Sequence, residues 1–412
     1  MDAPLSRIDV ESVVFEGTGE LISLLPNASP LTWVRNGEGV IGYGEFAKMH
    51  FSGASRFEDA AQWWREQLKG FRINDHIRVP GSGPIAFGSF SFDEAEDSVF
   101  IIPRVVVGKR GNTSWITRIG APAPLNHELL PTRKSSPLSW GEGSLSASEW
   151  EAAVGHAIVR ISAGELDKVV LARDVTATSE EPIDARVVME KLAEKYPNTW
   201  VFAVDGLVGA TPELLVRLTK GLVTSRVLAG TIRRTGDDQR DLALAASLAR
   251  SSKDLEEHDY AVRSVADALE PFCSSINVPD APFVLHLANV MHLATDVTGV
   301  VSDSMAVTNA LSLVDALHPT AAVCGTPREK AKKLINEYEV MKRGRYSGPV
   351  GWIDARGDGE WGIALRCAEI DAKDARKVRL FAGCGIVAGS VPQDELAESQ
   401  AKLVPMRDAL ES

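Results

Sequence analysis

The residues with the clearest chemical meaning lie near the C-terminal end of the chain, in a segment whose pattern predicts a helix. Glu395, Glu398 and Lys402 are spaced three and four residues apart. At about 3.6 residues per turn these positions share one face of a helix, so two carboxylates and one ammonium group stand side by side. Carboxylate oxygens are ligands that Mg²⁺ prefers, and the ammonium group attracts anions. This face is therefore suited to holding a hard cation next to an anionic ligand.

A second pair of carboxylates, Asp254 and Glu257, stands three residues apart in KDLEEHDYAV, within a helical pattern that runs from Asp237 to Leu269. An acidic run on a helix usually faces solvent, and that is the plainer interpretation. If this helix meets the C-terminal one across a cleft, the two carboxylate pairs supply the oxygen ligands of a Mg²⁺ site. No CxxC pair or close histidine pair accompanies them, which disfavours zinc.

Two further residues each have a structural and a chemical interpretation. Lys168 opens the apolar strand pattern KVVLARDVTAT, where a lysine either reaches past the strand end to water or is a desolvated amine that acts as a base. Glu213 lies in ATPELLVRL between Pro212 and two leucines. Burial would keep this carboxyl group protonated and make it a candidate proton donor.

Arg366 is a lone guanidinium in the apolar pattern WGIALRCAEI. It either pairs with a structural carboxylate or binds a ligand carboxylate through two hydrogen bonds. The run FAGCGIVAGS that follows is only a weak match to a phosphate loop, because no Gly-Lys-Ser/Thr follows it. Gly383 and Gly385 nevertheless permit a close approach of the backbone to an anion.

The elements that must position these residues come in blocks. Short β-prone runs predict a strand-rich part over residues 1–132. Residues 133–148 are rich in Ser, Pro and Gly and predict a linking loop, after which the spacing of Ser148 and Glu151 predicts a capped helix start. Residues 149–412 alternate groups of helices and strands. Such blocks are typical of an α+β fold with antiparallel sheets.

Composition narrows the class of protein. The 412 residues carry a formal net charge of −12, with 44% hydrophobic and 24% charged residues. No basic stripe is visible, which argues against a nucleic-acid partner, and no apolar run is long enough to span a membrane. The N-terminal residues lack a signal-peptide pattern. The cysteines are widely spaced, which fits the reducing cytoplasm. No long heptad pattern stands out, so we expect a cytoplasmic monomer.

A series of motifs resembles, in this order, the chorismate-utilising enzymes: KVVLARD, TPELLVR, LAGTIRR, KDLEEHD, HLAT, LHPTAAVCGTP, YSGPVGW, LRCAEI, and FAGCGIV followed by ExxExxxK. The resemblance covers about residues 145–408, and within the family it is strongest to the isochorismate synthases. It implies one large chorismate-binding α+β domain over residues 1–412. In that domain two sheets pack face to face as a β-sandwich, helices pack outside, and a Mg²⁺-dependent site lies between the sheets.

The resemblance also implies a role for each candidate residue. Lys168 falls on the lysine that activates water, and Glu213 falls on the general acid. Glu257 and Glu398 fall on direct metal ligands, with Asp254 and Glu395 as supporting carboxylates. The positions that bind the substrate or line its pocket are Gly230, Thr231, His292, Ala322, Tyr346, Arg366, Gly383, Gly385 and Lys402.

The activity implied is the Mg²⁺-dependent isomerisation of chorismate to isochorismate, in which water adds at C2 and the C4 hydroxyl group leaves. Lys168 favours water over ammonia as the nucleophile, so we expect no amidotransferase subunit. Ala322 is typical of isochorismate synthases, where salicylate synthases carry threonine. Tyr346 is familiar from salicylate synthases, which go on to eliminate pyruvate, and it keeps that activity as the alternative. A non-catalytic, Mg²⁺-dependent protein that binds an anionic metabolite is the hypothesis from another class.

Overall fold

A computed structural model describes residues 7–17, 19–26, 29–120, 136–302 and 308–411. Within these residues the strands are β1 (Ile8–Val14), β2 (Leu31–Arg35), β3 (Glu38–Phe51), β4 (Phe71–Asp75), β5 (Ile85–Ser89), β6 (Ser98–Arg110), β7 (Thr113–Ile119), β8 (Leu138–Glu142), β9 (Lys168–Ser179), β10 (Trp200–Val204), β11 (Leu207–Thr211), β12 (Leu214–Thr219), β13 (Leu222–Arg233), β14 (Cys273–Asn277), β15 (Phe283–His286), β16 (Val290–Val301), β17 (Gly325–Thr326), β18 (Pro349–Asp354), β19 (Gly359–Ile363), β20 (Cys367–Ile370) and β21 (Lys377–Ile386). The α-helices are α1 (Arg56–Lys69), α2 (Ala147–Ser162), α3 (Ala185–Lys195), α4 (Asp238–Leu248), α5 (Ser252–Leu269), α6 (Ala310–Leu317), α7 (Arg328–Tyr338) and α8 (Pro392–Glu411).

Hydrogen bonds join the strands into one continuous sheet. The sheet folds back on itself into two halves, here called the two walls. One wall runs β3–β2–β10–β11–β20–β21–β9–β8, and the other runs β5–β18–β19–β12–β13–β16. The long strand β6 pairs with both β3 and β5 and so connects them. The described pairs are antiparallel except β1 with β4. The expected α+β sandwich is therefore confirmed, with its two sheets continuous at β6.

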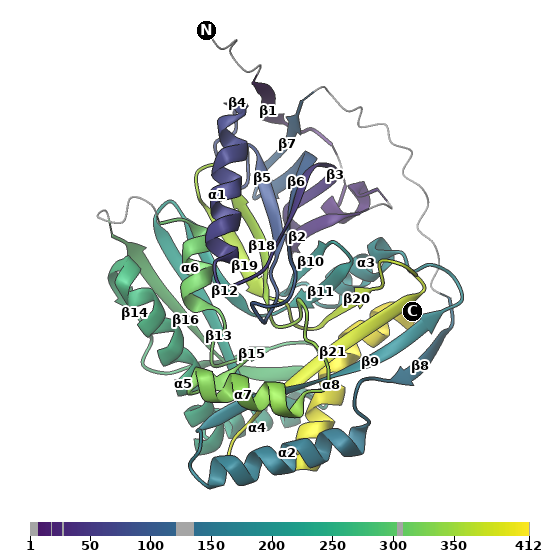
Figure 1. The fold of residues 1–412 in the computed structure, drawn as a ribbon, viewed down its shortest axis with the longest axis vertical. Helices are drawn as coiled ribbons and strands as arrows, with labels where there is room; N and C mark the ends of the chain where they lie inside the picture. The colour runs from purple at the N-terminus through teal and green to yellow at the C-terminus, as the bar shows by residue number, and fades with distance from the viewer. Residues whose placement is uncertain (1–6, 18, 27–28, 121–135, 303–307, 412) are drawn as a thin grey trace.

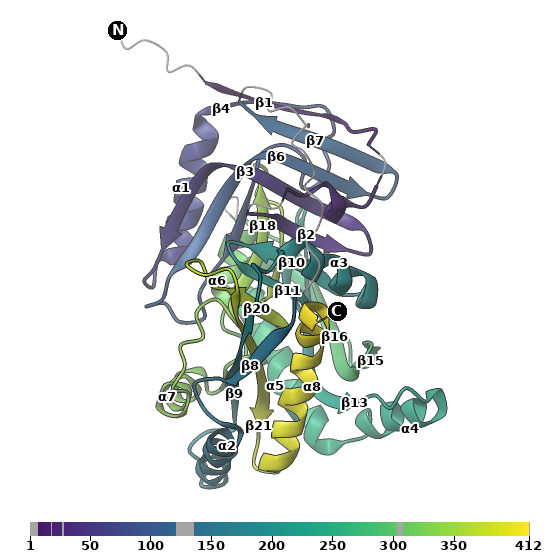
Figure 2. The ribbon, with the colours of Figure 1, turned by 90° about the vertical axis from the view of Figure 1, so that its right-hand side faces the viewer.

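Helices cover the outer faces of both walls (Figures 1 and 2). Helix α5 packs on β13 and β16, while α8 packs on β21 and against α2 and α3. One buried core cluster, which contains residues of both walls, combines aliphatic side chains with several aromatic ones. Trp33, Trp200, Phe202 and Trp352 are each at most 2% exposed, and their burial removes a large apolar area from water.

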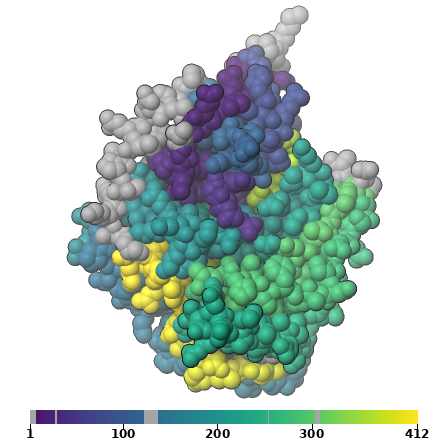
Figure 3. All heavy atoms as spheres, turned by 180° about the vertical axis from the view of Figure 1, so that it is seen from behind, coloured from purple at the N-terminus to yellow at the C-terminus, as the bar shows by residue number. Residues whose placement is uncertain are grey.

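The N-terminal part is tied to the rest of the molecule through both walls. Strand β2 pairs with β10, and β5 pairs with β18. Seen from behind, the N-terminal strands occupy the upper part of the molecule and C-terminal residues the lower part (Figure 3).

Among the described residues, no helix is both long and apolar enough to cross a membrane.

Several predicted boundaries were wrong. The capping box that starts α2 is formed by Ser146 and Glu149, whose side chains bond each other's backbone, so the helix begins two residues before the Ser148–Glu151 spacing suggested. The predicted loop 133–148 contains strand β8, which extends the edge of β9; residues 133–135 lie outside the described residues. The helical pattern 237–269 is divided into α4 and α5, because Ser251 caps a new helix by accepting from Asp254 N.

Candidate active site

A small, nearly filled cavity of about 60 Å³ lies where β9, β13, β16, β21, α5 and α8 meet. Usual ligand sites hold roughly 300–1,000 Å³, so the side chains that line this cavity leave little free space in it. The predicted site residues that line the cavity are Glu213, Gly230, Thr231, Glu257, His292, Ala322, Tyr346, Arg366, Gly383, Gly385, Glu398 and Lys402. The fold thus gathers residues that are far apart in the sequence.

Lys168 lies behind the cavity lining rather than in it. Its side chain is fully buried, and Nζ is 2.9 Å from Oε1 of Glu257 on α5. Within the described residues the amine makes no well-aligned hydrogen bond, so the contact is an ion pair. Gly385 opposite is needed for this contact, because a Cβ there would lie 2.3 Å from Glu257 Oε1 and 3.0 Å from Lys168 Cε. The interpretation of Lys168 as a strand-end lysine that reaches water is wrong.

Glu213 sits in the short turn between β11 and β12, with its side chain facing the cavity lining. Burial raises the pKa of its carboxyl group to about 8, and the nearby positive charges of Lys168 and Arg366 offset only part of this effect. The group is therefore protonated at neutral pH and can donate a proton inside the cavity.

Arg366, His292 and Thr231 form a polar chain along one wall. Arg366 Nη2 lies 3.3 Å from His292 Nε2, and His292 Nδ1 lies 3.1 Å from Thr231 Oγ1. Burial, reinforced by the charge of Arg366, lowers the pKa of His292 well below its usual value. The ring is therefore neutral, and we assign its proton to Nδ1 because Nε2 must accept from the guanidinium.

Arg366 has a backbone φ of +48°, a left-handed conformation that is uncommon for residues other than glycine. Strain of this kind clusters at binding and catalytic sites, where the surrounding structure holds the residue in place. The conformation lies in the bend between β19 and β20 and turns the side chain from the strand direction into the cavity.

Lys402 on α8 completes the positive charge of the site. Its Nζ lies 2.6 Å from Glu398 Oε1 and donates to the carbonyl of Gly383 at 2.9 Å. Burial lowers the pKa of this amine, but the charge of Glu398 and its hydrogen bond, together with the neighbouring Cys384, outweigh burial, so the pKa is raised. Tyr346 stacks on Phe381 with ring centroids 5.0 Å apart, and burial raises its pKa to about 12.

The carboxylates fit a hard cation only in part as they stand. Donor atoms of Glu395, Glu398 and Cys384 lie within 4.8 Å of one another. The Cys384 thiol donates to the Glu395 carbonyl at 3.2 Å, and burial raises its pKa well above the usual value, so the carboxylates are the better ligands. Glu257 lines the same cavity. Asp254 lies behind Gly230, where a Cβ added to the glycine would be 3.0 Å from Asp254 Cβ.

Sequence reasoning missed several apolar and backbone contributors. The cavity is also lined by Val170, Pro212, Leu228, Ala229, Val323, Ser347 and Leu365. Each lies one or two positions in the sequence from a predicted site residue, so the same motifs could have identified it. Ser347, with φ of +62°, follows Tyr346 and shares the left-handed conformation of Arg366.

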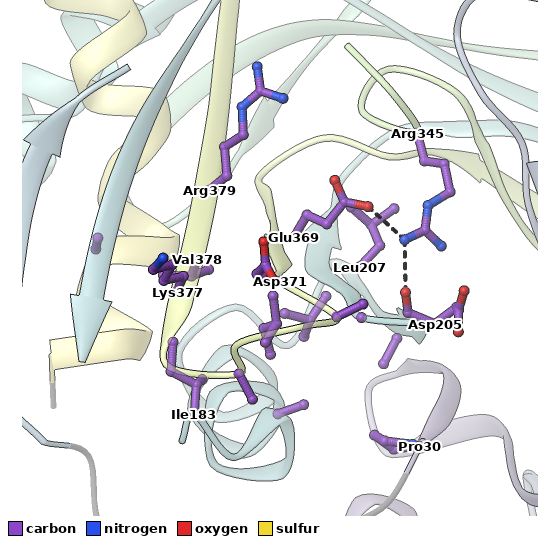
Figure 4. A pocket seen from close by; sticks show the side chains of 18 of the residues that line it. Pro30, Ile183, Asp205, Leu207, Arg345, Glu369, Asp371, Lys377, Val378 and Arg379 are labelled. Carbon is purple, nitrogen blue, oxygen red and sulfur yellow. Dashed lines mark hydrogen bonds and ion pairs between the residues drawn. The ribbon is translucent and has the colours of Figure 1, made fainter. Parts of the chain in front are cut away.

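A larger cavity, about 870 Å³, lies elsewhere, between the β10–β11 and β20–β21 turns (Figure 4). Arg345 in its lining contacts Glu369 at 2.7 Å and the carbonyl of Asp205 at 2.8 Å. None of the predicted site residues lines it. Volume alone therefore does not locate the chemistry, and we place the candidate site in the smaller cavity.

The family model described as "Chorismate binding enzyme" matches residues 32–411. The chain belongs to this family of chorismate-binding enzymes. The isochorismate synthase DhbC of Bacillus subtilis is 37% identical over 345 residues, which are 80% of this chain and 81% of that protein. The isochorismate synthase MenF of the same organism is 32% identical over 406 residues, 90% and 85% of the two chains.

Solved structures agree with the fold of this family member. DhbC from Bacillus anthracis has a TM-score of 0.79 at 32% identity and covers 95% of this chain, which in turn covers 98% of it. The chorismate-binding family and the two-walled sandwich are thus established together.

Proposed function

We propose that the protein is a Mg²⁺-dependent isochorismate synthase that converts chorismate to isochorismate. The observation that carries the proposal is a buried, protonated acid, Glu213, that lines one cavity together with Arg366, while a buried amine, Lys168, pairs with Glu257 of the same lining. The named activity of relatives at 32–37% identity over most of the chain supports it.

Two proton transfers are required, and each residue type suits one of them. To act as the base, Lys168 must first give up the proton that it holds in its ion pair with Glu257; it then takes a proton from the water that attacks C2. Glu213 gives its proton to the C4 hydroxyl group, which leaves as water while the ring double bond shifts. One water enters and one leaves, so the reaction is balanced as an isomerisation. Base and acid each return to their starting state when a proton passes back through solvent.

Binding and orientation fall to the positive groups. Arg366 would hold the enolpyruvyl carboxylate through its guanidinium, and neutral His292 fixes the guanidinium by accepting from Nη2. Gly383 and Gly385 keep the β21 backbone free of side chains where it borders the cavity. These contacts would orient the ring with C2 towards the amine and C4 towards the acid.

Glu257 and Glu398 would hold Mg²⁺ directly, with Asp254 and Glu395 as supporting carboxylates. The cation would neutralise the ring carboxylate of chorismate beside these acids. Oxygen donors on two helices that face one cavity are the set that Mg²⁺ prefers. In the described residues, Lys168 and Lys402 each neutralise one of the two direct ligands.

We also propose a cytoplasmic location, a monomer and no amidotransferase subunit. The four cysteines Cys273, Cys324, Cys367 and Cys384 are free thiols, which suits a reducing compartment. A site built around a lysine that activates water has no need of an ammonia supply.

The test is a chromatographic and mass-spectrometric product assay of the purified chain with chorismate and Mg²⁺, with lactate dehydrogenase added to report pyruvate. Isochorismate without pyruvate is the expected result. Salicylate with stoichiometric pyruvate would replace the proposal with a salicylate synthase. Tight binding of chorismate without any product would replace it with a binding protein.

A further inference from the structure

Glu339 and Arg343, between α7 and Tyr346, form a buried ion pair that the proton transfers do not use. Arg343 Nε and Nη2 donate to the two Glu339 oxygens at 2.8 and 2.5 Å, and each side chain is 3% exposed. The guanidinium also lies 4.2 Å from the ring centroid of Phe92. Replacing a buried ion pair with apolar residues is often neutral or stabilising, so stability alone does not account for this pair.

The remaining bonds of the pair hold two backbone segments of the active-site wall. Arg343 Nη1 donates to the Val323 carbonyl and Nη2 to the Val170 carbonyl, both at 2.8 Å. Val170 and Val323 both line the cavity. The guanidinium therefore ties β9 to the segment that carries Ala322 through main-chain atoms alone.

On the edge of β9 opposite β21, no described strand pairs with residues 170–174, and the ion pair bonds the β9 backbone there instead. Along this edge β17 pairs only with Lys168 and Val169, and β8 pairs with residues 175–179. Between them, Val170 N donates to the Cys324 carbonyl at 2.8 Å and Ala172 N donates to Glu339 Oε1 at 2.7 Å. The stretch just after Lys168 is thus fixed on one edge by β21 and on the other by these contacts.

We propose that the Glu339–Arg343 ion pair is a positioning element that sets the β9 backbone, and with it the Lys168 amine, relative to bound substrate. The inference rests on the proposed isochorismate synthase activity. Displacing a reacting group by about 1 Å can cost about 10²-fold in rate. The binding of the substrate carboxylates by Arg366 and Lys402 does not depend on this pair. Loosening it should therefore lower kcat and leave KM nearly unchanged.

The test uses the full chain with the double substitution Glu339→Leu and Arg343→Met. These apolar side chains have a volume similar to that of the original pair, and the double variant leaves no unpaired charge. The matched control is Asp184→Asn with Arg186→Met, which removes a second buried pair on α3 and keeps a residue able to cap that helix. We expect the test variant to lose about 10- to 100-fold in kcat with KM changed less than about threefold. The control should keep both constants.

An unchanged kcat in the folded test variant would overturn the inference, as would an equal loss in the control. If the test variant does not fold, Arg343→Lys decides. It keeps the charge but loses the two-pronged geometry, and a normal kcat there would overturn the inference too. A wild-type chain that forms no isochorismate would instead defeat the proposed function, so the two failures are distinguishable.

Discussion

The Nζ atom of Lys168 lies 2.9 Å from Oε1 of Glu257, so the proposed base and a proposed metal ligand form one buried ion pair. A cation bound to Glu257 competes with the lysine for the same carboxylate, because both carry positive charge. The base and the metal site are therefore coupled through Glu257, and a substitution of either residue should affect both functions.

Glu257→Gln should raise the Mg²⁺ concentration needed for half-maximal activity by at least about tenfold, because an amide is a weaker ligand than a carboxylate for a hard cation. The measurement is the initial rate as a function of Mg²⁺ after treatment with a chelator. Glu256→Gln is the control, since Glu256 precedes it on α5 but does not line the cavity. An unaltered Mg²⁺ dependence in Glu257→Gln would exclude it as a ligand.

Lys168→Met should lower kcat by about 10²- to 10⁴-fold, the usual contribution of a positioned base. Methionine fills the space of the lysine stem but leaves Glu257 without its partner, so we expect the variant to fold with a lowered thermal unfolding midpoint. Lys168→Ala should be equally inactive. Turnover at the normal rate in either variant would mean that another group activates the water.

The rate should fall as the pH rises through about 8, because the proposed acid Glu213 must carry a proton and its pKa is raised to about 8. A profile of kcat/KM across neutral and alkaline pH reports this group in the free enzyme. Glu213→Gln should lose most activity and should not show this alkaline limb. If the wild-type rate does not change as the pH passes through this range, a different acid acts.

The same group should make stability depend on pH. Its folded pKa of about 8 exceeds the unfolded value of about 4.3, so the folded state holds the proton more tightly. This contribution is fully present below the unfolded pKa and is lost as the pH rises through about 8. The unfolding free energy of the wild type should therefore fall relative to that of Glu213→Gln between these two pKa values. A parallel course of the two curves would contradict burial as the cause.

Gly385→Ala should abolish most activity, because the added Cβ would lie 2.3 Å from Glu257 Oε1 and would force apart the Lys168–Glu257 pair. Gly389→Ala is the matched control. Gly389 also precedes α8 in the chain, and nothing lies within 4 Å of a Cβ added there. We expect the control to keep the wild-type rate and metal dependence. Equal activity in the two variants would show that the ion pair adjusts freely around residue 385.

Local spacing was enough to predict the faces of the two acidic helices. Glu395 and Glu398 share a face because their separation matches one helical turn, and the same holds for Asp254 and Glu257. The order of the motifs identified the family and the type of fold. Boundaries were less predictable: Ser146 and Ser148 each precede a glutamate by three residues, and the structure shows that Ser146 is the cap.

The sequence by itself determined the chemical groups of the site and the helices and strands that carry them, because both depend on residue type and short-range period. Only the tertiary structure decided that Lys168 pairs with Glu257, that Glu213 is buried deeply enough to hold its proton, and that Arg343 reaches the carbonyls of Val170 and Val323. These contacts join residues far apart in the chain, and their energies depend on distance and burial, which exist only once the two walls of the sandwich have closed.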